Sequence, residues 1–197
     1  MPAFADLLGS RLAGIAGLAP DHIHKLEAHY ELLSRWNRRL NLTSIASLDV
    51  AVERHYCESV FLAGHLPESS LTIVDIGSGG GFPGIPVAIL RPDCPVTLVE
   101  AHQRKAVFLK EASRGLPNVR VLPTRAEEMA EVFDCAISRA VSYADLVPIL
   151  KKVARTADLL TGEEEPPGEM CFTWNEVIRL PWGTNRFLRL GVSRCFT

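Results

Sequence analysis

The sequence of 197 residues predicts an α/β fold, in which a mostly parallel sheet is covered by helices on both faces and preceded by an N-terminal helical extension. From residue 71 onward, short β-branched and apolar runs alternate with stretches of helical length, which is the pattern of strand–helix–strand units. Before that point, apolar residues recur every three or four positions, as along one face of a helix. We therefore expect residues 1–68 to form the extension and residues 69–197 the core, packed as one compact unit.

The helical extension is predicted from two stretches separated by a polar break. The first starts at Pro20-Asp21, where the aspartate can cap the helix or occupy its first turn. Its apolar stripe consists of Leu26, Tyr30, Leu33 and Trp36. Asn41–Ser44 then interrupts the pattern, because Asn, Thr and Ser favour turns and caps. A second helix is expected to start at Ser47 or Asp49.

The core is predicted from strands and helices that alternate along the chain. We expect strands at residues 71–75, 95–100, 119–122, 134–138, 170–174 and 187–192. Helices are expected from the loop after the first strand to about Arg91, from Gln103 to about Arg114, and from Tyr143 to Arg155. Because parallel neighbours need a crossover connection, this order places helices on both faces of the sheet.

Composition and charge exclude several classes of protein. No apolar run approaches the roughly 20 residues that span a bilayer, and no basic segment precedes an apolar stretch at the start, so we expect a cytoplasmic protein with no membrane partner. The 5 cysteines are scattered without a C-x-x-C pair and the 6 histidines form no ligand array, which predicts neither a disulfide framework nor a metal site. The net charge of -2 does not by itself indicate a nucleic-acid-binding protein.

Basic residues nevertheless cluster on three predicted helices. The clusters are Arg35, Arg38 and Arg39; Arg104, Lys105, Lys110 and Arg114; and Lys151, Lys152 and Arg155. Each cluster taken alone is interpreted as a solvated helix face. Convergence of several clusters on one side of the fold would instead indicate an anionic partner.

A glycine-rich segment, Asp75-Ile-Gly-Ser-Gly-Gly-Gly-Phe-Pro-Gly84, follows the first strand and is typical of a cofactor-binding loop. Gly79, Gly81 and Gly84 fit the dinucleotide fingerprint, in which glycines bring a pyrophosphate to a helix N-terminus. In an alternative frame, Asp75 ends the strand and glycines follow at positions 77, 79 and 81. In either frame, a Cβ atom would keep the ligand away from the backbone.

Charge favours the second frame. A carboxylate at position 75 would repel a pyrophosphate, whereas it suits S-adenosyl-L-methionine, which carries a cationic sulfonium and an ammonium and no phosphate. Phe82-Pro83 adds an apolar wall and a proline suited to a first helical turn. Glu100, which ends the next strand, can accept hydrogen bonds from both ribose hydroxyls of either cofactor. We therefore predict a Rossmann-like S-adenosylmethionine-dependent methyltransferase fold with a mostly parallel seven-stranded sheet, and S-adenosyl-L-methionine as its cofactor.

Two further segments follow strands at the sheet edge where open α/β sheets bind ligands. Thr124–Glu128 comes after the third strand, and it is interpreted equally well as a loop beside an adenine ring or as a simple helix start. Arg139 ends the fourth strand. An arginine is costly to place at this edge without a partner, so we favour a functional role for it.

With these residues, the chain resembles the bacterial 16S rRNA guanine-N7 methyltransferases, the RsmG or GidB family, from about residue 30 to residue 142. The motifs that carry the resemblance are Trp36-Asn37 with Asn41-Leu-Thr43, Arg54-His55, the glycine loop extended to Ile85-Pro86, Arg104-Lys105 with Phe108-Leu109, Arg125–Glu128, and Ile137-Ser-Arg-Ala140. The chain departs from the family at Trp174-Asn175, where many members carry Lys-Gly. The basic residues that can substitute there are Arg186, Arg189 and Arg194.

The resemblance implies a substrate and a set of contacts. The substrate would be a guanine in the decoding-region loop of 16S rRNA, within the small ribosomal subunit or its precursor, and we expect the enzyme to be a monomer. The implied cofactor contacts include Gly77, Phe82, Ala126, Glu127 and Arg139. The candidate RNA contacts are Arg54, His55 and Arg125. The pair Arg54-His55 can equally be a structural tie between the helices and the sheet, and Trp36 is expected to pack in the core because it lies on the apolar stripe.

The expected chemistry needs positioning rather than proton transfer. Guanine N7 has a lone pair and no proton to lose, so no general base is predicted, and catalysis would hold N7 in line with the cofactor methyl group. Arg139 is the candidate catalytic residue, and it or Arg125 can hold the guanine edge or a phosphate. The alternatives are a methyltransferase of a protein or small molecule, a nicotinamide-dependent oxidoreductase, which Asp75 disfavours, and a non-catalytic RNA-binding assembly factor with the same fold.

Overall fold

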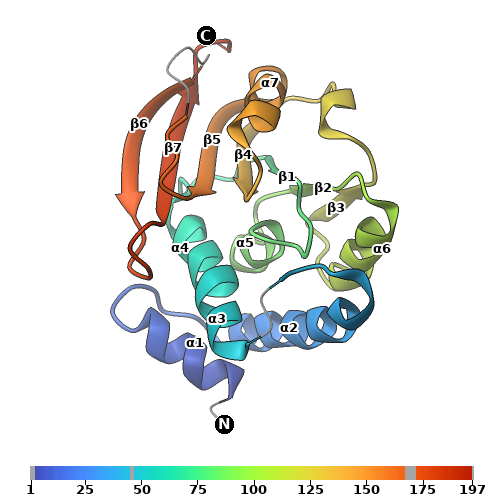
Figure 1. Ribbon diagram of the computed structural model, residues 1–197, viewed down its shortest axis with the longest axis vertical. Coiled ribbons are helices and arrows are strands. Elements are labelled where there is room, and N and C mark those ends of the chain that lie inside the picture. Colours follow the sequence, from blue (N-terminus) through green and yellow to red (C-terminus); the bar gives the residue numbers. More distant parts are fainter. Residues whose placement is uncertain (1–2, 45–46, 167–171, 197) are drawn as a thin grey trace.

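The computed structural model describes residues 3–44, 47–166 and 172–196. Within these residues, the strands form one seven-stranded sheet in the order β3-β2-β1-β4-β5-β7-β6. The strands are β1 (Ile73–Ile76), β2 (Val96–Val99), β3 (Val119–Leu122), β4 (Phe133–Arg139), β5 (Ala154–Thr161), β6 (Phe172–Arg179) and β7 (Phe187–Ser193). Strands β1 to β5 run parallel, and β7 is antiparallel between β5 and β6. The predicted mostly parallel sheet is confirmed (Figure 1).

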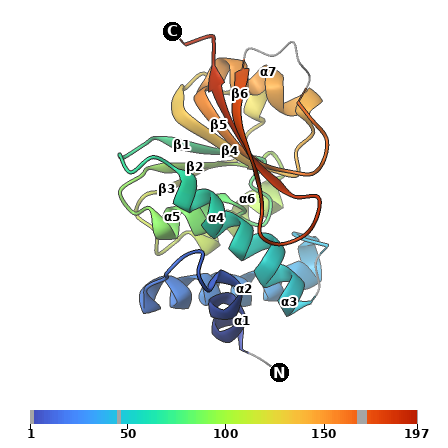
Figure 2. The same ribbon diagram turned by 90° about the vertical axis from the view of Figure 1, so that its left-hand side faces the viewer.

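Helices cover both faces of this sheet. They are α1 (Phe4–Leu12), α2 (Pro20–Leu40), α3 (Leu48–Ala51), the π-helical segment η1 (Val52–Cys57), α4 (Glu58–His65), α5 (Gly84–Leu90), α6 (Gln103–Ala112), the 3-10 segment η2 (Ala126–Glu128) and α7 (Tyr143–Val153). Figure 2 shows the sheet between α7 on one side and α4, α5 and α6 on the other, with α1 and α2 packed beyond these helices. In the part of the chain that is described, no helix has both the length and the apolarity that a membrane crossing requires.

Successive residues of β1 point to opposite faces of the sheet and therefore enter two different cores. Ile73 belongs to the larger core, which also contains buried residues of α1, α2, α4, α5 and α6. Val74 and Ile76 belong to a smaller core beneath α7. Because Leu8 of α1 shares the larger core with Leu98 of β2, the N-terminal helices are held to the sheet layer by a continuous apolar interior.

Strand β5 is the element that the sequence analysis missed. The predicted helix was extended to Arg155, whereas α7 ends at Val153 and the chain passes directly into β5. This strand lies between β4 and β7 and is buried along most of its length, so it lacks the alternation that identifies a half-exposed strand. Alanine and leucine also favour helices. The strand predicted at 170–174 is confirmed from Phe172, since residues 170 and 171 lie outside the described residues.

The second predicted helix is a continuous helical stretch from Leu48 to His65 with an irregular middle. Ser47, one of the two predicted start positions, is the N-cap residue, although its side chain forms no capping hydrogen bond. Residues Val52–Cys57 adopt a π-helix, a rare geometry that occurs mostly as single turns at functional sites. The segment carries Arg54 and His55, so the irregular backbone coincides with two predicted site residues.

Candidate functional site

The loop after β1 adopts a backbone that only glycine accepts easily. Gly77, Gly79 and Gly81 have φ angles of 74°, 54° and 90°. A Cβ atom at Gly77 would lie 2.9 Å from Cγ2 of Val141, and one at Gly81 would lie 2.6 Å from Cδ1 of Ile85. The alternate glycines are therefore required both by the turn and by the neighbouring side chains.

A pocket of about 530 Å³ lies over this loop, and we call it the loop pocket. It is lined by Asn41–Ser44, Arg54-His55, residues 77–80 with Phe82, and Arg139–Val141. The pocket thus lies at the carboxyl ends of β1 and β4, where open α/β sheets bind ligands. The predicted site residues that meet in it are Arg54, His55, Gly77, Gly79, Phe82 and Arg139.

Asp75 lies beneath the loop and does not line the pocket. Its side chain is fully buried, and Oδ2 accepts a hydrogen bond of 3.0 Å from the backbone N–H of Gly84, at the start of α5. Burial raises the pKa of Asp75 to about 7, and the hydrogen bond from Gly84 opposes that shift. The carboxylate therefore holds the glycine loop to the first turn of α5.

Glu100 follows the last residue of β2 and faces the loop from the other side. Its Oε2 accepts a hydrogen bond of 3.0 Å from the N–H of Gly79, and its Oε1 accepts one of 2.8 Å from the N–H of His102. Each carboxylate oxygen has a second lone pair, so the oriented side chain can still accept hydrogen bonds from a ligand.

The segment after β3 lies apart from the loop pocket. Ala126 and Glu127 belong to η2, and Arg125 is the residue immediately before it. Arg125 and Glu127 are exposed, and Ala126 packs at the margin of the core beneath α7. None of the three is among the residues that line the pocket, and they lie two strands away from the glycine loop.

A buried carboxylate, Glu58, collects three arginines beside the pocket, and we call this group the Glu58 cluster. Arg186 forms two hydrogen bonds with it, Nη2 to Oε2 at 2.7 Å and Nε to Oε1 at 3.1 Å. Nε of Arg139 lies 3.4 Å from Oε2, and Nε of Arg54 lies 3.5 Å from Oε1. One carboxylate cannot neutralise three guanidinium groups, so the cluster keeps a net positive charge at the wall of the pocket.

Arg139 is largely buried within this cluster. Burial lowers its pKa from the ordinary value, while the Glu58 carboxylate opposes the shift. Sequence analysis missed Glu58, although a single charged residue within the run Tyr56–Leu62 was the available signal. Of the three basic residues considered as substitutes near the C-terminus, Arg186 is the one that joins the cluster. Arg189 bonds to Thr161 and Arg194 to Thr173.

His55 is part of the wall of the pocket in an uncharged form. Its ring stacks on Phe82 with centroids 4.4 Å apart, and its Nε2 shares a hydrogen bond of 2.8 Å with Oγ1 of Thr43. Burial, followed by the charge of Arg139, lowers its pKa to about 3. The side chain is 3% exposed, which favours the interpretation of His55 as a structural tie.

A second histidine fixes the glycine loop from below. Nε2 of His29 donates a hydrogen bond to the carbonyl of Gly80 at 3.1 Å, and the hydroxyl of Tyr56 donates to its Nδ1 at 3.0 Å. Burial lowers the pKa of His29 to about 4, so the ring is neutral near pH 7. The helices α2 and η1 therefore support the loop, a role that no motif in the sequence indicated.

No cysteine of the described residues lines the loop pocket. Cys57, Cys94 and Cys135 are buried free thiols, and Cys195 is exposed. Over the same residues, no cluster of histidine, cysteine and acidic side chains could hold a metal ion.

Comparison with known proteins identifies relatives in sequence and in fold. The family model described as GidB, rRNA small subunit methyltransferase G, matches residues 22–160. A ribosomal RNA small subunit methyltransferase G of Neisseria gonorrhoeae is 39% identical over 155 residues, which cover 75% of this chain and 72% of the relative. One of Nitrosomonas europaea is 40% identical over 148 residues, covering 72% of this chain and 68% of the relative.

Solved structures show the same fold at low sequence identity. A SAM-dependent methyltransferase from Aquifex aeolicus superimposes with a TM-score of 0.57 at 16% identity, covering 73% of this chain and 93% of that one. A mutant of MtNAS in complex with S-adenosylmethionine gives a TM-score of 0.55 at 17% identity, covering 86% and 71%. The predicted S-adenosylmethionine-dependent methyltransferase fold is confirmed.

Proposed function

Since the chain belongs to the rRNA small subunit methyltransferase G family, we propose that it transfers a methyl group from S-adenosyl-L-methionine to N7 of a guanine in the decoding-region loop of 16S rRNA. The observation that carries this proposal is the loop pocket, in which a strand-end glycine loop meets the positively charged Glu58 cluster. A cofactor surface and an anion-binding wall thus share one cavity.

The residues around the loop fit the proposed cofactor. The glycine backbone allows close approach, and Glu100 presents an oriented carboxylate that can accept hydrogen bonds from ribose hydroxyls. Asp75 shapes the loop from beneath. Ala126 and Glu127 lie outside the loop pocket, so the adenine would have to extend past Glu100 to the end of β3 to contact them. When bound, the cofactor would supply an electrophilic methyl group.

The pocket is built to position a nucleophile rather than to remove a proton. His55, with a pKa of about 3, lies among arginines, and Asp75 is held beneath the loop, which agrees with a reaction at a nitrogen that has no proton to lose. Guanine O6 neighbours N7 and accepts hydrogen bonds, so Arg139 can donate to O6 while the N7 lone pair remains free. Orientation of this kind contributes to rate by fixing the near-attack geometry.

A labelling experiment tests the proposal. The purified protein is incubated with methyl-labelled S-adenosylmethionine and small ribosomal subunits from a strain that lacks the modification, with naked 16S rRNA and bulk protein as parallel substrates. We expect label at one guanine of the decoding loop, mapped through the labile glycosidic bond of 7-methylguanosine. Label confined to protein, or none in RNA while the cofactor binds, would overturn the proposal.

A further inference from the structure

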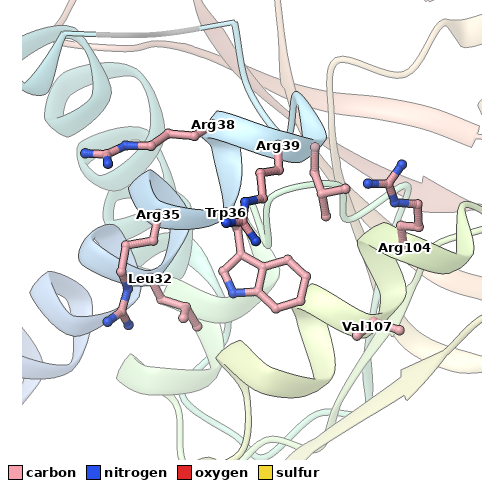
Figure 3. Close-up of a pocket in the computed structure, with 8 residues that line it drawn as sticks. Leu32, Arg35, Trp36, Arg38, Arg39, Arg104 and Val107 are labelled. Atoms are coloured by element: carbon pink, nitrogen blue, oxygen red, sulfur yellow. The ribbon is translucent and has the colours of Figure 1, made fainter.

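A second and larger cavity lies between α2 and α6, and we call it the arginine groove. It has a volume of about 780 Å³ and is lined by Leu32, Arg35, Trp36, Arg38, Arg39, Leu40, Arg104 and Val107. Figure 3 shows the indole of Trp36 between side chains from α2 and side chains from α6. Arg104, from the second basic cluster, therefore joins the three arginines of the first cluster on one surface, although the two helices are far apart in the sequence.

The arginines of this groove have no acidic partner among the described residues. The four guanidinium side chains are exposed, no acidic residue lines the groove, and none of the four forms an ion pair with an acid of the described chain. Arg38 and Arg39 lie in the last turn of α2, where the helix dipole favours a cation. Arg104 lies in the first turn of α6, where the dipole disfavours one. A bound anion would resolve that conflict.

The floor of the groove is apolar and partly aromatic. Trp36 packs against Phe108 with ring centroids 5.8 Å apart, as its place on the apolar stripe predicts, but its indole is only half-buried and also lines the groove. Val107 beside it is 55% exposed. An accessible aromatic face with arginines around it suits single-stranded nucleic acid, because the bases stack on the ring and the guanidinium groups bind the phosphates.

The groove and the loop pocket meet at the end of α2, which contributes lining residues to both. Leu40 lines the groove, and the next residue, Asn41, lines the pocket. Asn37, in the last turns of the same helix, donates from Nδ2 to the carbonyl of Thr43 and accepts from its N–H, both at 2.9 Å. The helix end that presents the arginines therefore also holds one wall of the pocket.

We propose that the arginine groove binds a single-stranded segment of the substrate RNA next to the base that enters the loop pocket. This proposal rests on the proposed function, because it takes the macromolecule methylated in the pocket to be RNA. It assigns the groove an affinity role, separate from the chemistry at the glycine loop.

The test compares two double variants that remove the same charge. Arg39→Gln with Arg104→Gln alters the groove, and Arg114→Gln with Arg155→Gln removes two exposed arginines elsewhere. The probes are a fluorescent 12-nucleotide oligouridylate, measured by anisotropy over a range of salt, and small ribosomal subunits in the methylation assay. For the groove variant we expect about tenfold weaker oligouridylate binding with a shallower salt dependence, about tenfold higher KM for subunits and unchanged kcat. The control pair should match wild type.

The outcomes separate this proposal from the proposed function. Unchanged RNA affinity and KM in the groove variant, or an equal loss in the control, would overturn the proposal that the groove binds RNA. Neither result would contradict the proposed methylation. Absence of RNA methylation by the wild-type protein would overturn the proposed function. Weaker binding of polyglutamate or anionic vesicles by the groove variant, with RNA binding unaffected, would assign the groove to an acidic protein or a membrane surface and overturn the proposal.

Discussion

The Glu58 cluster and the arginine groove both gather arginines near the loop pocket, but only the first supplies them with a counter-charge. Arg139 and Arg186 are largely buried and held by a carboxylate that is itself 0% exposed. The groove arginines are exposed, and none of them forms an ion pair with a described acid. A fixed guanidinium suits the orientation of a reacting base, whereas exposed, unpaired arginines suit the backbone of an RNA chain. We therefore expect substitutions in the Glu58 cluster to change kcat and substitutions in the arginine groove to change the affinity for RNA.

The largest effect is expected from removal of the buried counter-charge. Glu58→Gln leaves three guanidinium groups around a neutral side chain, and breaking a buried ion pair in this way costs about 3–5 kcal/mol of unfolding free energy. Glu131→Gln, which breaks the exposed pair with Arg120, should cost no more than about 1 kcal/mol. Urea unfolding measures both. Equal losses in the two variants would show that the Glu58 cluster is no more than a surface network.

The second largest effect is a pH dependence of stability, which we expect for the buried His29 beneath the glycine loop and not for RNA binding in the arginine groove. The folded state holds His29 neutral with a pKa of about 4, whereas the unfolded chain protonates it near 6.5, so stability is present above pH 6.5 and is lost as pH falls toward 4. For a fully buried group this amounts to about 3 kcal/mol. The stability difference between wild type and His29→Gln should shrink by that amount over this range. Asp75 is common to both proteins, so its opposite contribution cancels in the difference.

Unfolding free energies of the two proteins at pH 7.5, 5.5 and 4.0 provide this measurement. Binding of oligouridylate to the groove should stay constant over the same range wherever the protein remains folded, because no histidine lines the groove. A stability difference that does not depend on pH would show that His29 is not held neutral in the fold.

The third effect concerns rate. Arg139→Ala should lower kcat about 100-fold, since misplacement of a base by about 1 Å costs this much, and it should change the RNA affinity of the groove little. Arg139→Lys retains the charge without the planar guanidinium and should recover only part of the rate. Single-turnover methylation of small subunits gives the rate, and circular dichroism reports the fold. Arg155→Ala is the matched control, and full activity in Arg139→Ala would refute the positioning role.

The smallest effect is expected at the loop itself. Gly77→Ala places a Cβ atom 2.9 Å from Val141 in a residue whose φ is 74°, and the left-handed strain alone costs about 1–2 kcal/mol. Calorimetry should show weaker binding of S-adenosylmethionine, while oligouridylate binding is unchanged. Gly115→Ala, whose Cβ would meet nothing within 4 Å, serves as the control. An unaltered cofactor affinity in Gly77→Ala would remove the glycine loop from the cofactor site.

Much of the fold and part of the site were accessible from local patterns. The alternate glycines, the acid at the end of β1 and the acid after β2 each depend on short-range geometry, so their positions follow from strand length and turn sterics. Strand β5 was missed because a strand that is buried on both faces does not alternate between apolar and polar residues. It also contains Asp158, a residue type that is seldom buried, and burial raises the pKa of this carboxyl to about 7. The segment after β3 was predicted as part of the site, and the structure leaves it outside the loop pocket.

The sequence by itself predicted the strand-and-helix order of the core except for β5, the glycine loop and the family, because these depend on contiguous residues whose spacing reflects backbone periodicity. Only the tertiary structure decided which charges meet. Glu58 and Arg186 are 128 residues apart, and Arg104 joins arginines from a helix that ends before β1 begins. Whether a charge is neutralised or left free depends on which surfaces pack together, and packing joins residues that no local pattern connects.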